Sequence, residues 1–186
     1  MPNYSGMWTL QAQMQAVSQS NWTGIPSYSM YGFGFNYQGC LGDFTVIDRS
    51  SPVQVGSSIT TWSQVIGATN ATAAITSTGS LYTWGSVQYG SLGQNDAIPR
   101  SSPVQVGALT TWSKIAGAGY GFFAIKSDGT LWGWGLGTSG QLGQNDTVNR
   151  SSPVQIGSGT TWASVGAALE SGFGVKTDGT LWSWGN

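Results

Sequence analysis

The sequence repeats itself with a period of about 50 residues, and this repeat limits the possible folds more than any other feature. The motif Arg-Ser-Ser-Pro-Val-Gln, followed by Val or Ile and then Gly, begins at Arg49, Arg100 and Arg150. Two further motifs, Thr-Trp and Leu-aromatic-x-Trp-Gly, recur in the same register in all three copies. Because self-similarity at this period is typical of solenoids and propellers, we expect an array of similar structural units.

Each unit is expected to hold four short β-strands. No stretch of the repeat region shows sustained helical periodicity, and turn residues separate its alternating apolar and polar stretches. Asp128-Gly129 and Asp178-Gly179 predict tight turns before the last strand of their units, because glycine supplies the positive φ that such a turn requires. In the first unit the strands are expected at 52–55, 62–66, 73–76 and 81–84.

The last strand of each unit carries an aromatic stripe. Tyr82 and Trp84 should point to one face of the sheet and Leu81 to the other, because side chains alternate along a strand. Four strands with a recurring aromatic signature are typical of a propeller blade. The predicted fold class is therefore all-β, with three β-propeller-type tandem repeats of about 50 residues after an extra N-terminal strand that matches 81–85.

A short segment that does not repeat precedes the repeats. We therefore divide the chain into an N-terminal anchoring segment, 1–28, and a propeller region, 29–186. Closed propellers have about four to eight blades, so three units would leave apolar residues exposed at both ends of the array. We expect chains to self-associate and complete a ring, or the repeats to be part of a longer protein. The units of the propeller region are 29–48 (partial), 49–99, 100–149 and 150–186.

Composition and charge exclude several classes of protein. Charged residues make up 7% of the chain and the net charge is −1, so we expect no basic surface for nucleic acid. The 10 tryptophans argue against a disordered chain. No run of about 20 apolar residues is present to span a membrane. No secretory signal is visible at the N-terminus, so we expect assembly in a cytoplasm.

The residue types that carry much of enzyme chemistry are scarce. The sequence has no histidine and a single cysteine, so it can build neither a Ser-His-Asp triad nor a thiolate metal cluster. Asp96 and Asp146 each stand four residues before an arginine, and we interpret these couples as scaffold ion pairs. Cys40 is expected to be a small buried residue. We expect no enzymatic activity, no cofactor and no metal.

Binding residues are expected where the units differ, since the scaffold explains the repeated positions. The units differ between their second and third strands and again after their fourth strand. Loops on a rigid scaffold often carry binding residues, and exposed aromatic side chains suit contacts with proteins or sugars. The alternative is drift at unconstrained positions. The candidates for the binding surface are Tyr37, Tyr89, Asn70, Tyr120, Phe122 and Glu170.

One stretch of the sequence resembles a known family. The residues Ala-Ile-Lys-Ser-Asp-Gly-Thr-Leu-Trp-Gly-Trp-Gly at 124–135, followed by Gly-Gln-Leu-Gly at 140–143, resemble the regulator-of-chromosome-condensation repeat. The resemblance covers about residues 29–186 and implies a bladed β-propeller, usually of seven blades. Eukaryotic members include a nucleotide exchange factor for a small GTPase, and bacterial relatives include a secreted β-lactamase inhibitor. The histidine common in family repeats is absent here, and we see no insertion that could act as the exchange factor's wedge.

The N-terminal segment resembles a second group of proteins. The residues Gly-Met-Trp-Thr at 6–9, the glutamine-rich stretch after them and a second tryptophan are similar to a short N-terminal motif of tail-associated virion proteins from marine bacteriophages. Leu10, Met14 and Val17 fall at helical spacing, which predicts a short helix that docks on a partner. The alternative is a frayed chain end. The anchoring candidates are Trp8, Leu10, Met14 and Trp22.

Together these features predict a non-enzymatic structural protein of a bacteriophage virion. The resemblance implies a tail or fibre location, with assembly in the host cytoplasm and release by lysis. The propeller would contact protein partners in the assembly, or a receptor or glycan on the host surface. We expect neither nucleic acid nor a membrane span. The alternative is a bacterial surface or secreted protein-binding module, such as an adhesin or an enzyme inhibitor.

Overall fold

The repeats fold into a series of antiparallel sheets. The computed structural model describes residues 29–186 except residues 57 and 60. The strands are β1 (Tyr31–Gly34), β2 (Arg49–Gln54), β3 (Trp62–Ala68), β4 (Ala71–Thr76), β5 (Leu81–Gly85), β6 (Arg100–Gln105), β7 (Trp112–Ala118), β8 (Gly121–Lys126), β9 (Leu131–Gly135), β10 (Arg150–Gln155), β11 (Trp162–Ala167), β12 (Ser171–Lys176) and β13 (Leu181–Gly185). Two short 3-10 helices, η1 (Tyr37–Gly39) and η2 (Gln88–Gly90), follow β1 and β5. The predicted all-β class is confirmed.

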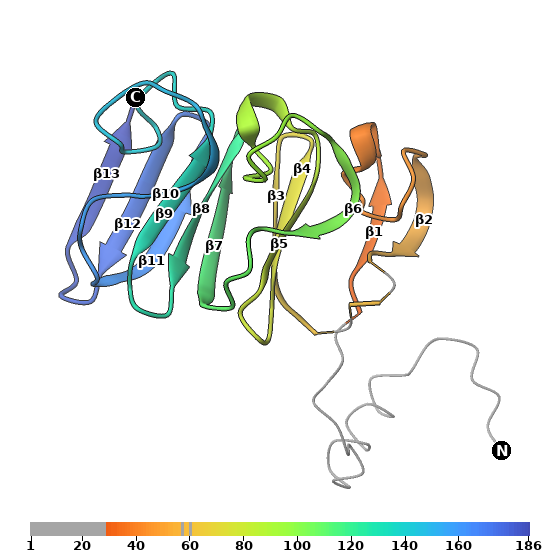
Figure 1. Cartoon of the computed structure of the whole chain (residues 1–186), viewed down its shortest axis with the longest axis horizontal. Helices are drawn as coiled ribbons and strands as arrows, with labels where there is room; N and C mark the ends of the chain where they lie inside the picture. Colours follow the sequence, from red (N-terminus) through yellow and green to blue (C-terminus); the bar gives the residue numbers. More distant parts are fainter. Residues whose placement is uncertain (1–28, 57, 60) are drawn as a thin grey trace, which may run out of the picture.

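The sheets follow one another along the long axis of the molecule (Figure 1). In chain order they are sheet 1 (β1 and β2), sheet 2 (β3–β6), sheet 3 (β7–β10) and sheet 4 (β11–β13). Sheets 2 and 3 are four-stranded blades in which each strand pairs with its sequence neighbour. Within the described residues, sheet 4 has three strands and sheet 1 only two, so both ends of the series are incomplete.

The blades are offset from the sequence repeats. Each repeat contains four strands, as predicted, but the first of them belongs to the preceding sheet, which corrects our assignment of the four strands to a single blade. The motif that opens a repeat forms the outer strand of the preceding sheet: β6 pairs with β5, and β10 pairs with β9. The backbone N–H of Val106 continues this pairing by donating to the carbonyl oxygen of Leu81 at 2.8 Å. An outer position suits the motif, because its proline lacks an N–H and is tolerated only at a sheet edge. The outer strand thus ties consecutive repeats together.

The hairpin turns form where the glycines predicted them. Gly129 and Gly179 have φ values of 78° and 84°. A β-carbon at Gly129 would collide with the carbonyl oxygen of Thr160, so this turn needs glycine for space as well as for conformation. These turns connect β8 to β9 and β12 to β13, which pair as antiparallel neighbours.

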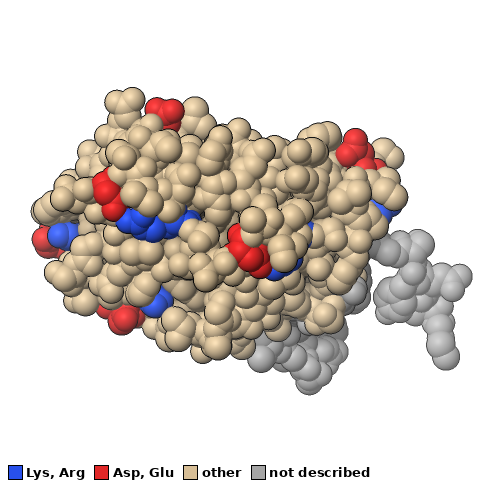
Figure 2. Space-filling view, turned by 45° about the horizontal axis from the view of Figure 1, so that its top comes forward, with Lys and Arg blue, Asp and Glu red and all other residues tan. Residues whose placement is uncertain are grey.

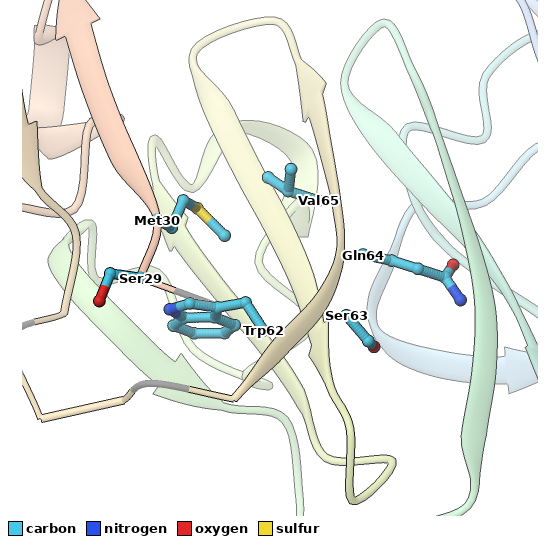
Figure 3. Close-up of a pocket in the computed structure, with 6 residues that line it drawn as sticks. All are labelled: Ser29, Met30, Trp62, Ser63, Gln64 and Val65. Atoms are coloured by element: carbon cyan, nitrogen blue, oxygen red, sulfur yellow. The ribbon is translucent and has the colours of Figure 1, made fainter. Parts of the chain in front are cut away.

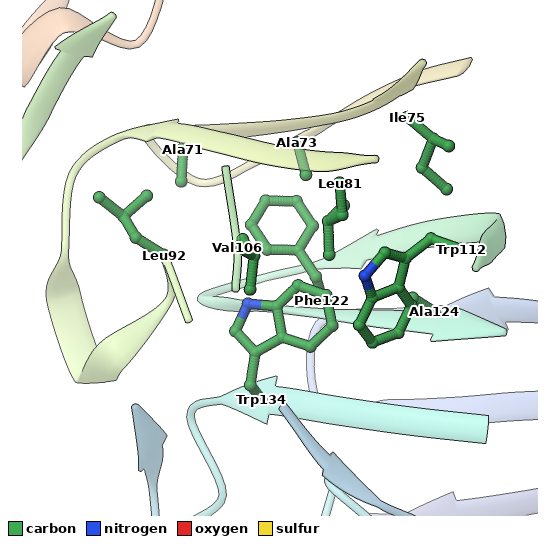
Figure 4. Close-up of a cluster of buried hydrophobic side chains, with 10 residues drawn as sticks. All are labelled: Ala71, Ala73, Ile75, Leu81, Leu92, Val106, Trp112, Phe122, Ala124 and Trp134. Atoms are coloured by element: carbon green, nitrogen blue, oxygen red, sulfur yellow. The ribbon is translucent and has the colours of Figure 1, made fainter. Parts of the chain in front are cut away.

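The hydrophobic core lies between successive sheets. Figure 4 shows the cluster between sheets 2 and 3, where Phe122 and Trp134 of sheet 3 pack beside Leu81 of sheet 2. A corresponding cluster between sheets 3 and 4 contains Leu131, with Trp184 packed against it. Each fully buried side chain of this size contributes about 1.5–3 kcal/mol. The sheets therefore depend on their neighbours for most of their stabilisation.

The predicted alternation along the fourth strand is confirmed. Leu81 belongs to the core shared with sheet 3, whereas Trp84, on the opposite face of the same strand, packs with Val55 toward sheet 1. The indole N–H of Trp84 donates to the carbonyl oxygen of Cys40 at 3.0 Å. Each blade therefore presents one face to the preceding sheet and one to the next.

The innermost strands make the same contact at each junction. β7 packs against β3 and β4, and β11 packs against β7 and β8. The side-chain amide of Gln64 donates to the carbonyl oxygen of Ser113 at 2.6 Å. Lys114, one repeat later, donates to the carbonyl oxygen of Ala163 in the same way. A side chain from β3 and one from β7 thus each bind the backbone of the next inner strand.

Leu131 and Leu181 occupy the same repeat position with opposite exposure. Leu131 is 0% exposed between sheets 3 and 4, whereas Leu181 is 71% exposed because no described residue covers that face of sheet 4. Leu131→Ala should lower the free energy of unfolding by about 2–5 kcal/mol. At a chain concentration low enough to keep the protein monomeric, Leu181→Ala should change it by less than about 0.5 kcal/mol. Urea denaturation followed by tryptophan fluorescence measures both, and equal losses would contradict this assignment of the core.

Candidate binding surface at the loop face

Two sets of loops meet at one end of the sheets. The backbone N–H of Ser86 donates to the carbonyl oxygen of Asn70 at 2.7 Å, which joins the turn between β3 and β4 to the segment after β5. The N–H of Thr69 donates to the carbonyl oxygen of Gly119 at 2.7 Å, which joins the turns of neighbouring sheets. Both regions of sequence variation therefore form one surface. We call it the loop face; it consists of residues 35–38, 69–70, 86–89, 119–120, 136–139 and 169–170.

Tyr89 and Tyr120 come together on the loop face from different sheets. Their ring centroids lie 5.2 Å apart with the rings edge to face, at an interplanar angle of 73°. Tyr89 is 50% exposed and Tyr120 is partly buried. Such aromatic pairs prefer edge-to-face or offset geometry, and each ring combines a large apolar surface with a hydroxyl group. The pair is a rigid, amphipathic contact site that spans the junction between two blades.

The backbone of Tyr89 adopts the same conformation as its counterpart in the preceding unit. Its φ is 57°, in the left-handed region that non-glycine residues rarely enter. Gln38, at the equivalent position of the preceding unit, has a φ of 52°. Because glutamine and tyrosine share the conformation, the strain comes from the 3-10 helices that follow β1 and β5 and does not require one particular side chain.

A second aromatic pair lies on the first loop of this surface. The rings of Phe35 and Tyr37 are stacked with centroids 6.0 Å apart and an interplanar angle of 4°, and both side chains are exposed. Phe35 was not among the sequence candidates, although its loop was singled out. Tyr37 was selected because it is an aromatic residue in a variable loop. The same criterion, applied two residues earlier in that loop, would have selected Phe35.

Phe122 is not a surface residue, which corrects its assignment to the binding surface. The strand that contains it, β8, begins at Gly121, so Phe122 faces the core and is 0% exposed. Its ring lies 5.9 Å from that of Trp134. The error arose because we expected the loop before the third strand to extend through Phe122, whereas the strand already begins at Gly121.

The remaining candidates lie on the loop face with different exposures. Glu170 is exposed, and Asn70 is partly buried with a φ of 57°. The backbone carbonyl oxygens of both residues accept hydrogen bonds from the segments that follow the fourth strands. These backbone contacts fix the two turns, so the side chains of Asn70 and Glu170 are presented from anchored positions.

The loop face is shallow around the tyrosine pair. A hollow of about 10 Å³ lies there, lined by Tyr120, Leu136 and Leu169 among others. Sites for small organic ligands usually measure about 300–1,000 Å³, so this hollow is far too small for one. Leu169 is 67% exposed at its rim. A flat surface with exposed aromatic and apolar side chains suits contact with a protein or a glycan chain.

The acidic residues of the outer loops serve the scaffold, as predicted. Asp96 pairs with Arg100 at 2.6 Å, and Asp146 pairs with Arg150 at 2.5 Å. Figure 2 shows these charges as small mixed groups on a mostly uncharged surface. Each aspartate also accepts a hydrogen bond from a backbone N–H two residues ahead. The pairs therefore fold the loop that leads into the outer strand.

Asp43 builds the corresponding anchor in the first unit and is more buried. Its burial would raise the pKa of the carboxyl group, but hydrogen bonds from Thr45, Arg49 and Asn36 outweigh this effect and hold the pKa below its ordinary value. The carboxylate is thus ionised and fully engaged. A group in this state is suited to holding the loop together and not to accepting a proton in catalysis.

Cys40 is only partly buried, in contrast to the expected burial. Its thiol donates to the carbonyl oxygen of Phe35 at 3.2 Å. Burial is the main cause that raises the pKa of this thiol, so the reactive thiolate form is disfavoured at neutral pH.

Other expectations concern metals, membranes and the N-terminal segment. In the part of the chain that the structure describes, no group of three His, Cys, Asp or Glu side chains could hold a metal ion. No helix there has the length and apolar character needed to cross a membrane. The anchoring candidates Trp8, Leu10, Met14 and Trp22 lie outside the described residues.

Comparison with solved structures identifies the fold. The chain resembles human WBSCR16 with a TM-score of 0.74 and 21% identity, over 83% of this chain and 42% of that one. It resembles yeast RCC1 (Prp20), in a structure bound to Kap60, with a TM-score of 0.71 and 19% identity, over 85% of this chain and 40% of that one. The chain therefore spans about two fifths of the length of these structures. A comparison with curated protein sequences found no match.

Comparison with family profiles agrees with the structural neighbours. The regulator of chromosome condensation (RCC1) repeat matches residues 78–125 and 128–168. The matched region contains β5 and β6 of sheet 2, nearly all of sheet 3 and the strand β11 of sheet 4. The offset sheets, the aromatic fourth strand and the Asp-Gly turn all lie within or beside it. The chain therefore contains RCC1 repeats at residues 78–125 and 128–168, and its fold is that of a β-propeller built from such repeats.

Proposed function

We propose that the chain is a non-enzymatic binding protein that contacts a macromolecular partner through its loop face. The observation that carries this proposal is the pair formed by the exposed Tyr89 and the partly buried Tyr120 at the junction of two blades. Aromatic side chains are enriched among the residues that dominate binding energy, because they bury a large area at a low cost in conformational entropy. The shallow surface around the pair favours a protein or glycan over a small molecule.

The scaffold supports a non-enzymatic role because three of its aspartates are already engaged. Asp96 and Asp146 are bound by arginines, and Asp43 is held by hydrogen bonds from three neighbours. Because these carboxylates are paired within the scaffold, we assign them a structural role. Variation between units is concentrated on the loop face, which is where a binding protein would diversify.

The tyrosine pair can be tested directly by substitution. The double variant Tyr89→Ala/Tyr120→Ala should weaken binding to any ligand of this surface by at least about tenfold, because both central anchors are lost. Leu109→Ala provides a control, since Leu109 is 49% exposed at the opposite end of the blades. The labelled chain would be titrated on an array of bacterial surface glycans and on purified virion proteins. Equal binding by the double variant and the control would contradict the proposal.

The setting that we propose for this surface is the tail or fibre of a bacteriophage virion. The similarity of residues 6–22 to an N-terminal motif of marine phage virion proteins supports it. In that setting the partners are neighbouring virion proteins or a receptor or glycan on the host surface. The alternative, a bacterial surface or secreted module, would use the same loop face toward a different partner.

Location in the particle is open to direct observation. Antibodies raised against the chain should label the tail or fibres of purified particles in immunogold electron microscopy. Mass spectrometry of the same particles should recover peptides of the chain, in a fixed ratio to other virion proteins. A chain that is found in the lysate and is absent from washed particles would refute the virion assignment and favour the secreted module.

We also propose that the open face of sheet 4 is covered by a second copy of the chain. Phe173 and Leu181 are exposed on this face, whereas Phe123 and Leu131, their counterparts in sheet 3, are buried by the inner strand of the next sheet. A second copy carries inner strands of the same kind. Because the chain spans only about two fifths of its structural neighbours, additional blades are needed for a ring of their size.

Light scattering measures this association. The purified chain should have a mass that is a multiple of 19.5 kDa. Leu181→Asp should shift it to a monomer, because a charge on the covered face would lose its hydration. Leu109→Asp, at a site away from that face, should leave the mass unchanged. A monomer of the unaltered chain at micromolar concentration would overturn the proposed self-association.

A further inference from the structure

Sheet 1 lacks the two inner strands that the complete blades possess. β1 corresponds to β5, the third strand of sheet 2, and β2 corresponds to its outer strand β6. In sheet 2 the inner edge of β5 pairs with β4, whereas the same edge of β1 pairs with no strand among the described residues. A two-stranded sheet by itself is only marginally stable in water. This sheet therefore needs further strands at the inner edge of β1.

A pocket lies where those strands would be. It has a volume of about 500 Å³ and lies between the start of β1 and the inner strand β3; its lining residues are Ser29, Met30, Trp62, Ser63, Gln64 and Val65. In Figure 3, Met30 and Val65 lie on the side of β3 that faces β1, and Gln64 points the other way, toward the next sheet. Val65 is 54% exposed, whereas Ile115 and Val165, at the same position of β7 and β11, are partly buried against the preceding sheet. The surface of β3 is thus built to be covered.

The aromatic residues of β1 also lack the covering strand that their counterparts have in the later sheets. In each later sheet a tryptophan from the inner strand packs over two aromatic residues of the third strand; in sheet 2, Trp62 contacts Tyr82 and Trp84, with ring centroids 5.5 and 5.9 Å away. Tyr31 and Phe33 hold these two positions in sheet 1 and are 59% and 68% exposed. An inner strand with an adjacent aromatic residue would cover them.

The chain itself supplies a segment of matching length at this place. Ser29 and Met30 line the pocket, so the segment that precedes them in the sequence is attached at the pocket. At the 51-residue spacing of the first two repeats, 11–17 correspond to β3 and 20–25 correspond to β4. Residues 1–28 contain no charged side chain, and the pocket lining contains none either. The segment therefore meets the pocket without the desolvation of a charge.

The sequence of this segment also has the pattern of a half-buried strand. Residues 11–17 read Gln-Ala-Gln-Met-Gln-Ala-Val, a strict alternation of glutamine with apolar residues through residue 16. A period of two is typical of a strand. At the 51-residue spacing, Gln13 and Gln15 correspond to Gln64 and Ile66, which face the next sheet, so the glutamines lie on the side toward β3 and Met14 lies on the other side. Trp8 lies just before this stretch, at the end where Trp62 begins β3. The pattern fits a strand better than the helix suggested by Leu10, Met14 and Val17.

A second copy of the chain fits this pocket less well. The strands that it has to offer are those of sheet 4, in which β12 is already paired with β13. β13 is the counterpart of β1, so the β12 of one copy could reach the β1 of another only if β13 were displaced. Breaking one sheet to complete another gains no net pairing.

We propose that residues 11–25 occupy this pocket as the two inner strands of sheet 1. Residues 11–17 form the innermost strand, with Gln13 and Gln15 toward Val65 and β3, and residues 20–25 pair with the free edge of β1. The N-terminal segment is then part of the first blade of its own chain. This proposal does not depend on the partner of the loop face, and it replaces a free docking helix at residues 1–28 with a strand pair that anchors the fold.

Hydrogen–deuterium exchange of the full chain, measured by mass spectrometry, tests the proposal. The amides of 11–17 and 20–25 should exchange at least about tenfold more slowly than those of a free peptide with the same sequence. Val65→Asp should remove this protection because it puts a charge into the pocket. Val148→Asp is the matched control, since Val148 is 55% exposed in the loop before β10 and lies outside the pocket lining.

A second pair of variants leaves the pocket itself unchanged. Gln15→Asp should remove the protection, whereas Met14→Asp, on the other side of the same strand, should retain it. All variants must keep the protection of β7–β9, which shows that the blades remain folded. Free-peptide exchange rates in residues 11–25 at every chain concentration would overturn the proposal. Protection that appears only as the concentration rises would also overturn it and would assign the pocket to a second copy.

Discussion

The packing of each sheet against the next is the interaction on which the rest of this structure depends. Every blade is apolar on both faces, so Leu81 needs the sheet that follows and Trp84 needs the sheet that precedes. Stability in such an array is close to a sum of nearest-neighbour terms. The two complete blades each have neighbours on both sides, and the incomplete sheets at the ends expose the residues that the complete ones bury.

The same packing creates the candidate binding surface. Tyr89 and Tyr120 belong to different sheets and meet only because β7 packs against β3 and β4. The scaffold fixes the backbone at both positions through hydrogen bonds between the turns and the exits of the blades. Side chains on the loop face can therefore change from unit to unit without disturbing the core. A family that repeats one blade can in this way present different surfaces.

The N-terminal segment connects the question of folding to the question of function. If residues 11–25 complete sheet 1, the uncharged, glutamine-rich sequence is explained by a strand that covers Val65 and pairs with β1. An anchoring role in a virion would then fall to residues 1–10 or to the loop face. The aromatic pairs on that face, Tyr89 with Tyr120 and Phe35 with Tyr37, become the main surfaces for contact with other molecules.

The sequence by itself determined the repeat, the all-β class, the glycine turns and the alternation along the fourth strand. These features are local, because turn chemistry and the period of two act within a few residues. Only the tertiary structure decided that the motif at Arg100 joins the preceding sheet, that Phe122 is buried and that Tyr89 meets Tyr120. Each of these depends on which distant backbone or sheet face becomes the neighbour, and no spacing along the chain encodes that choice.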